Sequence, residues 1–196
     1  MISRIDHVSI AVKDGQKALR FFIDLLGAVP GAAASDPVMK YRWQIMSLGD
    51  LSRLEVIYPI EEGSFLTNFL SDKQGGVHHI TLQTPDIAAA VRKLDENHIP
   101  YFGYNEYSGA YWKEIFIHPK HAFGVLIQIS EFHADDWLAD SEKLPSNQKW
   151  SLEKTEHGYL LNIAHSGGGK KSVELTTEEI KLLGKTIDEL TRQSRA

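Results

Sequence analysis

Residues 75–94, GGVHHITLQTPDIAAAVRKL, repeat a pattern that has already occurred once in the chain, in residues 6–22, DHVSIAVKDGQKALRFF. At an offset of 72 positions, the corresponding residues are His7 and His79, Ser9 and Thr81, Asp14 and Asp86, Ala18 and Ala90, and Arg20 and Arg92. Both copies begin with the alternating apolar residues of a strand and continue through an aspartate into a run with helical spacing. Two copies are too few for a solenoid, so the repeat predicts one pseudo-symmetric domain built from two similar halves.

The composition is that of an ordinary globular protein. The 196 residues are enough for one domain, or one domain with a small appendage. A net charge of −5 gives no reason to expect nucleic acid or an anionic membrane as a partner. The chain contains no cysteine, which excludes disulfides and thiolate metal sites. No apolar run is long enough to span a bilayer, and we expect a cytoplasmic protein without a signal peptide.

Hydrophobic periodicity predicts a β-α-β-β-β order in each half, with one helix covering one face of a sheet. In the first half we expect strands over residues 5–12, 41–48 and 54–59, a helix from Asp14 to Gly27, a loop over 31–37, and a short helix or irregular crossover over 61–72. In the second half we expect strands over residues 77–83, 101–104, 111–117 and 124–129, and a helix over 86–97.

The character of the sequence changes after Phe132. We expect a paired domain over residues 1–132, with halves of about 1–72 and 73–132, then a linker over 133–149. A small extension over 150–196 follows, with two or three strands and a helix that opens with a Thr176–Glu179 capping box. We expect the apolar face of this helix to be buried against the main domain or a partner subunit.

Four polar residues occupy matching places in the two halves. Glu55 follows His7 by 48 residues, and Gln128 follows His79 by 49, each within an otherwise apolar strand. A polar side chain buried without a partner in such a strand costs about 2–7 kcal/mol, so we expect something polar to satisfy it. Two imidazoles, one carboxylate and one amide oxygen that converge on one point predict a divalent metal site with open positions.

Several motifs within residues 1–132 together resemble the vicinal oxygen chelate superfamily, most of all methylmalonyl-CoA epimerase and then glyoxalase I. They are DHVSIAVKD (6–14), ALRFFIDLLGA (18–28), LGDLSRLE (48–55), GGVHHITL (75–82) and HPKHAFGVLIQI (118–129). The resemblance implies an α+β fold in which two βαβββ modules form a curved half-barrel sheet around one metal ion. It implies as ligands His7, Glu55, His79 and Gln128.

The chain departs from the resembled enzymes at the last ligand. That position usually carries a glutamate, often assigned as the base, whereas this chain has Gln128, whose amide cannot accept a proton. The epimerases also tend to have a glutamate before the third strand, where the nearest acidic residue here is Asp36. Either Glu55 has taken over the proton transfer, or the chain has lost it. On the sequence alone, Gln128→Glu is a change that would restore a catalytic carboxylate.

The function predicted first is a divalent-metal-dependent isomerase or lyase that stabilises the enolate of a small carbonyl or acyl-thioester substrate. We expect Glu55 to be the base, one ion per site of cobalt, nickel, zinc, manganese or iron, and a homodimer that binds neither nucleic acid nor membranes. Weaker candidates for substrate contact are Ser9, Thr81, Gln83 and Lys120. Two alternatives stay open, an iron dioxygenase with two histidines and one carboxylate, and a binding protein without catalysis.

Overall fold

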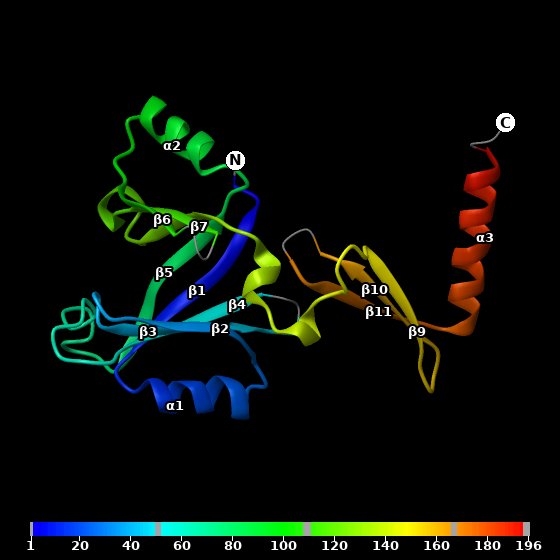
Figure 1. Ribbon diagram of the computed structural model, residues 1–196, viewed down its shortest axis with the longest axis horizontal. Helices are drawn as coiled ribbons and strands as arrows, with labels where there is room; N and C mark the ends of the chain where they lie inside the picture. The colour runs from blue at the N-terminus through cyan, green and yellow to red at the C-terminus, as the bar shows by residue number, and fades with distance from the viewer. Residues whose placement is uncertain (1, 50–51, 108–110, 166–167, 194–196) are drawn as a thin grey trace. The chain divides into compact units, whose positions relative to one another are not determined.

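The two copies of the repeat form neighbouring strands at the centre of one eight-stranded sheet. These strands, β1 (Arg4–Val12) and β5 (Gly75–Gln83), pair antiparallel (Figure 1). The computed structural model describes residues 2–49, 52–107, 111–165 and 168–193. It divides the chain into two compact units, residues 1–141 and 142–196, and the sheet belongs to the first.

Each half of the first unit contributes four neighbouring strands, in the order β2-β3-β4-β1-β5-β8-β7-β6. The first half contains β1, α1 (Gly15–Leu19), the π-helical η1 (Arg20–Leu25), β2 (Val29–Asp36), β3 (Tyr41–Ser47) and β4 (Arg53–Pro59). The second half contains β5, α2 (Ile87–Glu96), β6 (Phe102–Tyr107), β7 (Trp112–Ile117), the 3-10 turn η2 (Pro119–His121) and β8 (Ile127–Glu131). Short 3-10 turns η3 (Ala134–Trp137) and η4 (Asp140–Glu142) follow. The predicted α+β class, with two βαβββ modules in one curved half-barrel sheet, is confirmed.

Two details of the first half differ from the sequence prediction. Residues 31–37 were expected to be a loop, but most of them lie in the edge strand β2, which pairs antiparallel with β3. Their small side chains have low strand propensity, and pairing with β3 outweighs that preference. The single helix expected after Asp14 is α-helical only over α1 and continues as the π-helix η1. Residues 61–72 form turns, which is the irregular crossover rather than the helix.

The helices cover the outer face of the sheet. In the second half, Ile87 and Ala90 of α2 pack on three isoleucines of β7 and β8, which are Ile115, Ile117 and Ile129. In the first half, α1 and η1 pack on Met46, Val56 and Tyr58. These apolar clusters leave the inner face to a different set of side chains, many of them polar.

Two β-bulges interrupt the pairing of β1 with β5. Ile5 pairs with Leu82 and His7 with Thr81, so Asp6 is an extra residue on β1. Ser9 pairs with His79 and Ile10 with Val77, so His78 is an extra residue on β5. Each bulge therefore lies directly before one of the two repeated histidines, at equivalent places in the two halves.

The second unit is a three-stranded antiparallel sheet followed by a helix. Its elements are β9 (Trp150–Lys154), β10 (Tyr159–Ala164), β11 (Lys170–Leu175) and α3 (Thr177–Gln193). Asn162 is buried in this sheet, where it donates to Ser151 and Glu153 and accepts from Ser172. The predicted capping box is present, because the Thr176 backbone N–H donates to Glu179 and the Glu179 N–H to Thr176.

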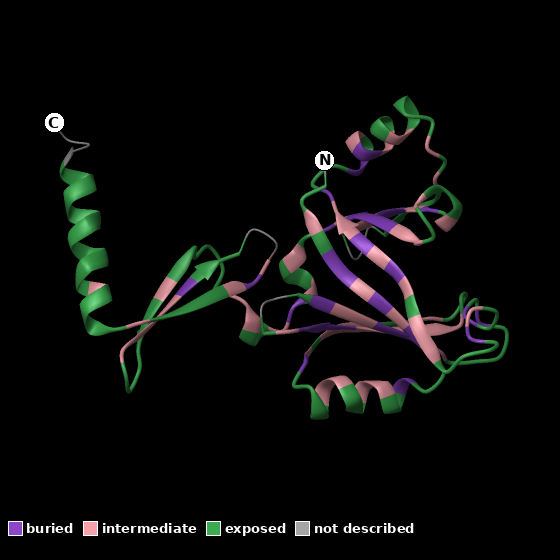
Figure 2. Ribbon diagram, turned by 180° about the vertical axis from the view of Figure 1, so that it is seen from behind, coloured by how far each residue is buried: buried purple, intermediate pink, exposed green. Residues whose placement is uncertain are grey.

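The apolar side chains of α3 are largely exposed (Figure 2). Leu183 and Ile187 keep 38% and 50% of their surface accessible. Burial of this face against the first unit or a second subunit stays a prediction. Among the described residues, no helix is long and apolar enough to cross a membrane.

Gly15, the first residue of α1, provides a test of the packing between α1 and β4. A Cβ added to Gly15 would lie 2.3–2.5 Å from ring atoms of Tyr58, which is itself buried. We expect Gly15→Ala to lower the free energy of unfolding by about 1–3 kcal/mol, because the ring must move in a filled core. Urea unfolding measures the change. Gly49→Ala is the matched control, because a Cβ there meets nothing within 4 Å. Equal stability of both variants would contradict the packing described here.

Candidate active site

Three of the four predicted metal ligands meet on the inner face of the sheet. His7 lies on β1, Glu55 on β4 and His79 on β5, and one ligand atom of each lies within 4.8 Å of the other two. Glu55 Oε2 is 3.8 Å from His7 Nε2 and 3.6 Å from His79 Nε2. Bonds from a divalent ion to imidazole nitrogen or carboxylate oxygen are about 2.0–2.2 Å long, so atoms at these separations can share one ion.

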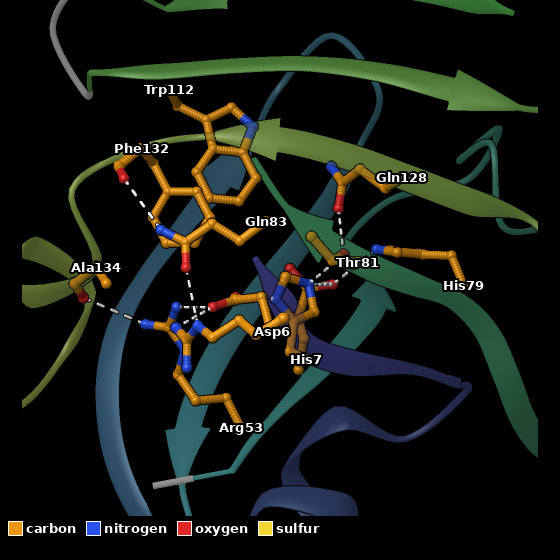
Figure 3. Close-up of polar contacts among 12 residues, drawn as sticks. Asp6, His7, Arg53, His79, Thr81, Gln83, Trp112, Gln128, Phe132 and Ala134 are labelled. Atoms are coloured by element: carbon orange, nitrogen blue, oxygen red, sulfur yellow. Dashed lines mark hydrogen bonds and ion pairs between the residues drawn. The ribbon is translucent and has the colours of Figure 1, made fainter. Parts of the chain in front are cut away.

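Gln128, the fourth predicted ligand, is connected to His7 by the Thr81 hydroxyl. The Thr81 hydroxyl lies 2.9 Å from His7 Nε2 and donates to Gln128 Oε1 at 2.5 Å (Figure 3). The parallel pairing of β5 with β8 places Thr81 opposite Gln128, just as the pairing of β1 with β4 places Ser9 opposite Glu55. The Thr81 hydroxyl thereby lies between the amide oxygen of Gln128 and the imidazole of His7.

The surroundings of the Glu55 carboxylate fit a bound cation. Glu55 Oε2 is buried and has no hydrogen-bond partner among the described residues. Burial raises the pKa of this carboxyl group above its usual value, against the opposing effect of His7. A buried carboxylate oxygen without a donor is costly, and a divalent ion held jointly with His7 and His79 removes that cost. The residues present therefore fit a metal site.

Asp6 orients the imidazole of His7. Its Oδ2 lies 2.7 Å from His7 Nδ1, and its Oδ1 accepts hydrogen bonds from Arg4 and Arg53 (Figure 3). Burial opposes ionisation of Asp6, but the hydrogen bond with His7 and the charge of Arg53 outweigh it, so the pKa of Asp6 lies below its usual value. An ionised Asp6 accepts the Nδ1 proton of His7, which leaves the Nε2 lone pair directed into the site.

His78 plays the corresponding part for His79. The two Nδ1 atoms are 2.9 Å apart. Burial, together with Lys73, lowers the pKa of His78 to about 4, and burial with His7 and His78 lowers that of His79 well below its usual value, so both rings are neutral. A proton on His79 Nδ1, shared with His78, leaves Nε2 free for a metal. The ionised Asp6 thus fixes the tautomer of His7, whereas in the second half a metal on Nε2 requires the shared proton to lie on His79 Nδ1.

The site opens into a cavity of about 190 Å³ whose walls combine aromatic and polar side chains. The lining side chains, apart from the predicted ligands His7, Glu55 and Gln128, are Asp6, Asp36, Tyr41, Trp43, Ile45, Arg53, Tyr107, Trp112, Glu114 and Trp137. Trp137 comes from η3, within the residues expected to form a linker, and its ring lies 5.5 Å from that of Trp43 and 5.0 Å from that of Trp112. Asp36 lines the cavity while it caps the backbone N–H groups of Val38 and Met39.

Glu114, on β7, is a functional candidate that the sequence analysis did not identify. It is 8% exposed, and its carboxylate accepts from four side chains, which are Asn105, Tyr107, Trp112 and Gln128. The alternation of Trp112, Glu114 and Phe116 along the strand gave a signal that could have identified it. A glutamate that shares a strand face with two aromatic residues is directed inward.

Of the four residues predicted to contact substrate, two lie beside predicted metal ligands and two do not line the cavity. Ser9 is buried on β1 beside Glu55, and Thr81 lies between His7 and Gln128. Gln83 does not line the cavity, because its amide accepts from Arg4 and donates to the Phe132 carbonyl (Figure 3). Lys120 lies in the turn η2 between β7 and β8, and it does not line the cavity either.

The chain is similar to known proteins over this unit. Human mitochondrial methylmalonyl-CoA epimerase is 34% identical over 132 residues, which are 66% of this chain and 74% of the relative. The ethylmalonyl-CoA/methylmalonyl-CoA epimerase of Cereibacter sphaeroides is 34% identical over 134 residues, 67% of this chain and 99% of the relative. The crystal structure of methylmalonyl-CoA epimerase from Mycobacterium tuberculosis superposes with a TM-score of 0.61 at 26% identity, covering 67% of this chain and 89% of that one.

These similarities confirm the resemblance that the sequence motifs indicated. The two epimerase sequences match about two thirds of the chain. A family model matches residues 6–116, which is more than half of the chain and includes His7, Glu55 and His79. The chain belongs to the Glyoxalase/Bleomycin resistance protein/Dioxygenase superfamily.

Proposed function

We propose that this chain is a divalent-metal-dependent epimerase that removes and returns the proton on the carbon beside the carbonyl group of an acyl-CoA thioester. The observation that carries the proposal is the convergence of His7, Glu55 and His79 in a chain whose relatives are named as epimerases of methylmalonyl-CoA and ethylmalonyl-CoA. Methylmalonyl-CoA and ethylmalonyl-CoA are therefore the first substrates to test.

The metal would be held by His7, Glu55 and His79, with the oxygen of Gln128 as a fourth ligand. A divalent ion supplies positive charge that stabilises the negative charge developing on a carbonyl oxygen. Asp6 holds the imidazole of His7 in the required tautomer, and His78 can accept the Nδ1 proton of His79. Nitrogen and oxygen ligands of this kind suit cobalt, nickel, zinc, manganese or iron.

Glu55 is the side chain best suited to accept the proton. Its Oε2, the oxygen that would bind the ion, has no donor among the described residues, so Glu55 would release the ion in order to accept the proton. Gln128 is an amide and cannot serve as a base. Both oxygens of Glu114 already accept hydrogen bonds. In the metal-free protein, burial raises the pKa of the Glu55 carboxyl group.

The aromatic walls would exclude water from the reacting carbon. Trp137 packs against both Trp43 and Trp112 beside the polar residues, so an acyl group can be held against apolar surface. Low water content strengthens the electrostatic interactions in such a site. Tyr41 keeps its proton at any ordinary pH, because burial raises the pKa of its hydroxyl, and it can act only as a hydrogen-bond partner of substrate.

That the chain forms a homodimer stays a prediction.

The metal assignment makes a direct prediction for the two histidines. We expect the wild type to bind about one divalent ion per chain, and His7→Ala and His79→Ala to lose that binding with the fold preserved. Removing one ligand from a preformed site costs affinity more than packing. Elemental analysis and cobalt titration measure binding, and circular dichroism measures the fold. His121→Ala, in the exposed turn η2, is the control. A wild type that takes up none of cobalt, nickel, manganese and zinc would refute the assignment.

The base assignment predicts that Glu55→Gln loses proton exchange. With methylmalonyl-CoA or ethylmalonyl-CoA in heavy water, we expect exchange of the α-proton to slow by about 10²–10⁴-fold, because the amide cannot accept a proton. NMR follows the exchange, and metal content is measured in the same samples. Glu106→Gln makes the same substitution at an exposed position of β6 and should exchange at the wild-type rate. Normal exchange in Glu55→Gln would assign the proton transfer to another group. Absence of exchange with any thioester in the wild type would favour the dioxygenase or binding-protein alternative.

A further inference from the structure

We propose that Glu114 is a positioning residue that turns the amide oxygen of Gln128 toward the histidines, and that Glu114 and Gln128 operate only as a matched pair. The inference rests on the proposed function in taking the Gln128 oxygen as a metal ligand. The contact between the two side chains is a property of the fold alone.

The amide of Gln128 has a different partner at each end. Its Nε2 donates to Glu114 Oε2 at 2.6 Å, and its Oε1 accepts from Thr81 at 2.5 Å. A primary amide donates only through nitrogen and accepts only through oxygen. Turning it by 180° would place its oxygen against a carboxylate oxygen and remove the hydrogen bond to Glu114, whereas the Thr81 hydroxyl could accept from the amide nitrogen instead. Gln128 is 6% exposed, so water cannot compensate for that loss. Glu114 therefore selects the orientation in which the oxygen faces His7.

Glu114 is itself held in place by three further side chains. Trp112 Nε1 donates to Oε2 at 2.7 Å, while Asn105 Nδ2 and the Tyr107 hydroxyl donate to Oε1 at 3.1 and 3.4 Å. With donors to both oxygens, the carboxylate is fixed relative to β6 and β7. Because Gln128 on β8 donates to this carboxylate, the side chain of Gln128 is held in place as well.

The pairing explains why the last strand carries an amide. A carboxylate at position 128 would lie about as close to Glu114 as the amide nitrogen does now, 2.6 Å. Two carboxylates at such a distance cannot both ionise. The sequence alone suggested that Gln128→Glu would restore function, and the position of Glu114 reverses this expectation. The amide is the ligand type that a neighbouring carboxylate requires.

Exchanging the two residues tests the pair. We expect E114Q and Q128E each to weaken cobalt binding by about 10–100-fold, the range for loss of a residue that orients a ligand. Each should also lower the melting temperature of the metal-free protein. The double variant E114Q/Q128E again has one donor amide facing one carboxylate, but the new amide nitrogen also faces Trp112 Nε1, which in the wild type donates to Oε2, so the double variant should recover part of both losses. E106Q, the same substitution on neighbouring β6, should match the wild type in both measurements.

The outcomes test the pairing of Glu114 with Gln128 separately from the proposed function. Additive losses in the double variant, in melting temperature or in cobalt affinity, would overturn the pairing. If no variant and no wild-type sample binds cobalt, the proposed function fails, and the melting temperatures still decide the pairing. Recovery of cobalt affinity in the double variant without recovery of α-proton exchange would show that Glu114 takes part in the chemistry itself, and would overturn a purely positioning role.

A second measurement covers the case in which Q128E does not fold. In the metal-free wild type, one side-chain amide proton of Gln128 should resonate downfield and exchange slowly with water, because it is held in a short hydrogen bond to a carboxylate. In E114Q that resonance should move upfield and its exchange should speed up. An unchanged Gln128 signal in E114Q would overturn the proposal.

Discussion

The antiparallel pairing of β1 with β5 determines where every polar side chain of the inner face lies. In this ladder His7 is opposite Thr81 and Ser9 is opposite His79, which brings the two repeated histidines within reach of one another. Since side chains alternate along a strand, a slip of one residue would turn the histidine of the slipped strand to the helix-covered face. The bulges at Asp6 and His78 fix the register and place a hydrogen-bond partner directly before each histidine.

The same register explains how the fourth strands complete the site. In each half the residue two positions after the histidine pairs in parallel with the polar residue of the fourth strand, Ser9 with Glu55 and Thr81 with Gln128. The inner face consequently concentrates groups that are costly to bury singly. Hydrogen bonds among them reduce the cost and hold each in one orientation. Asp6 shows this best, since it contacts His7 and two arginines at 3% exposure.

The sequence was sufficient for the features that repeat. The 72-residue offset and the alternation of apolar residues predicted the two modules, and three of the four predicted ligands form one group. Features that depend on neighbours in space were missed. β2 is a strand because β3 pairs with it, which the composition of residues 31–37 does not indicate. Trp137 reaches the cavity from beyond the second module, and Glu114 becomes significant only once β7 is paired with β8.

The two halves share a fold but differ at the positions that determine chemistry. Trp43 and Glu114 are equivalent, since each pairs with the residue two places after its fourth-strand ligand, Ile57 or Ser130. In the first half the neighbour of the carboxylate ligand is an indole, and Glu55 Oε2 keeps a lone pair without a donor. In the second half the neighbour of the amide ligand is a carboxylate that binds the amide nitrogen. Each ligand is thus matched to its neighbour. In the proposed function, one half of this symmetric fold would supply the proton acceptor and the other a fixed neutral oxygen.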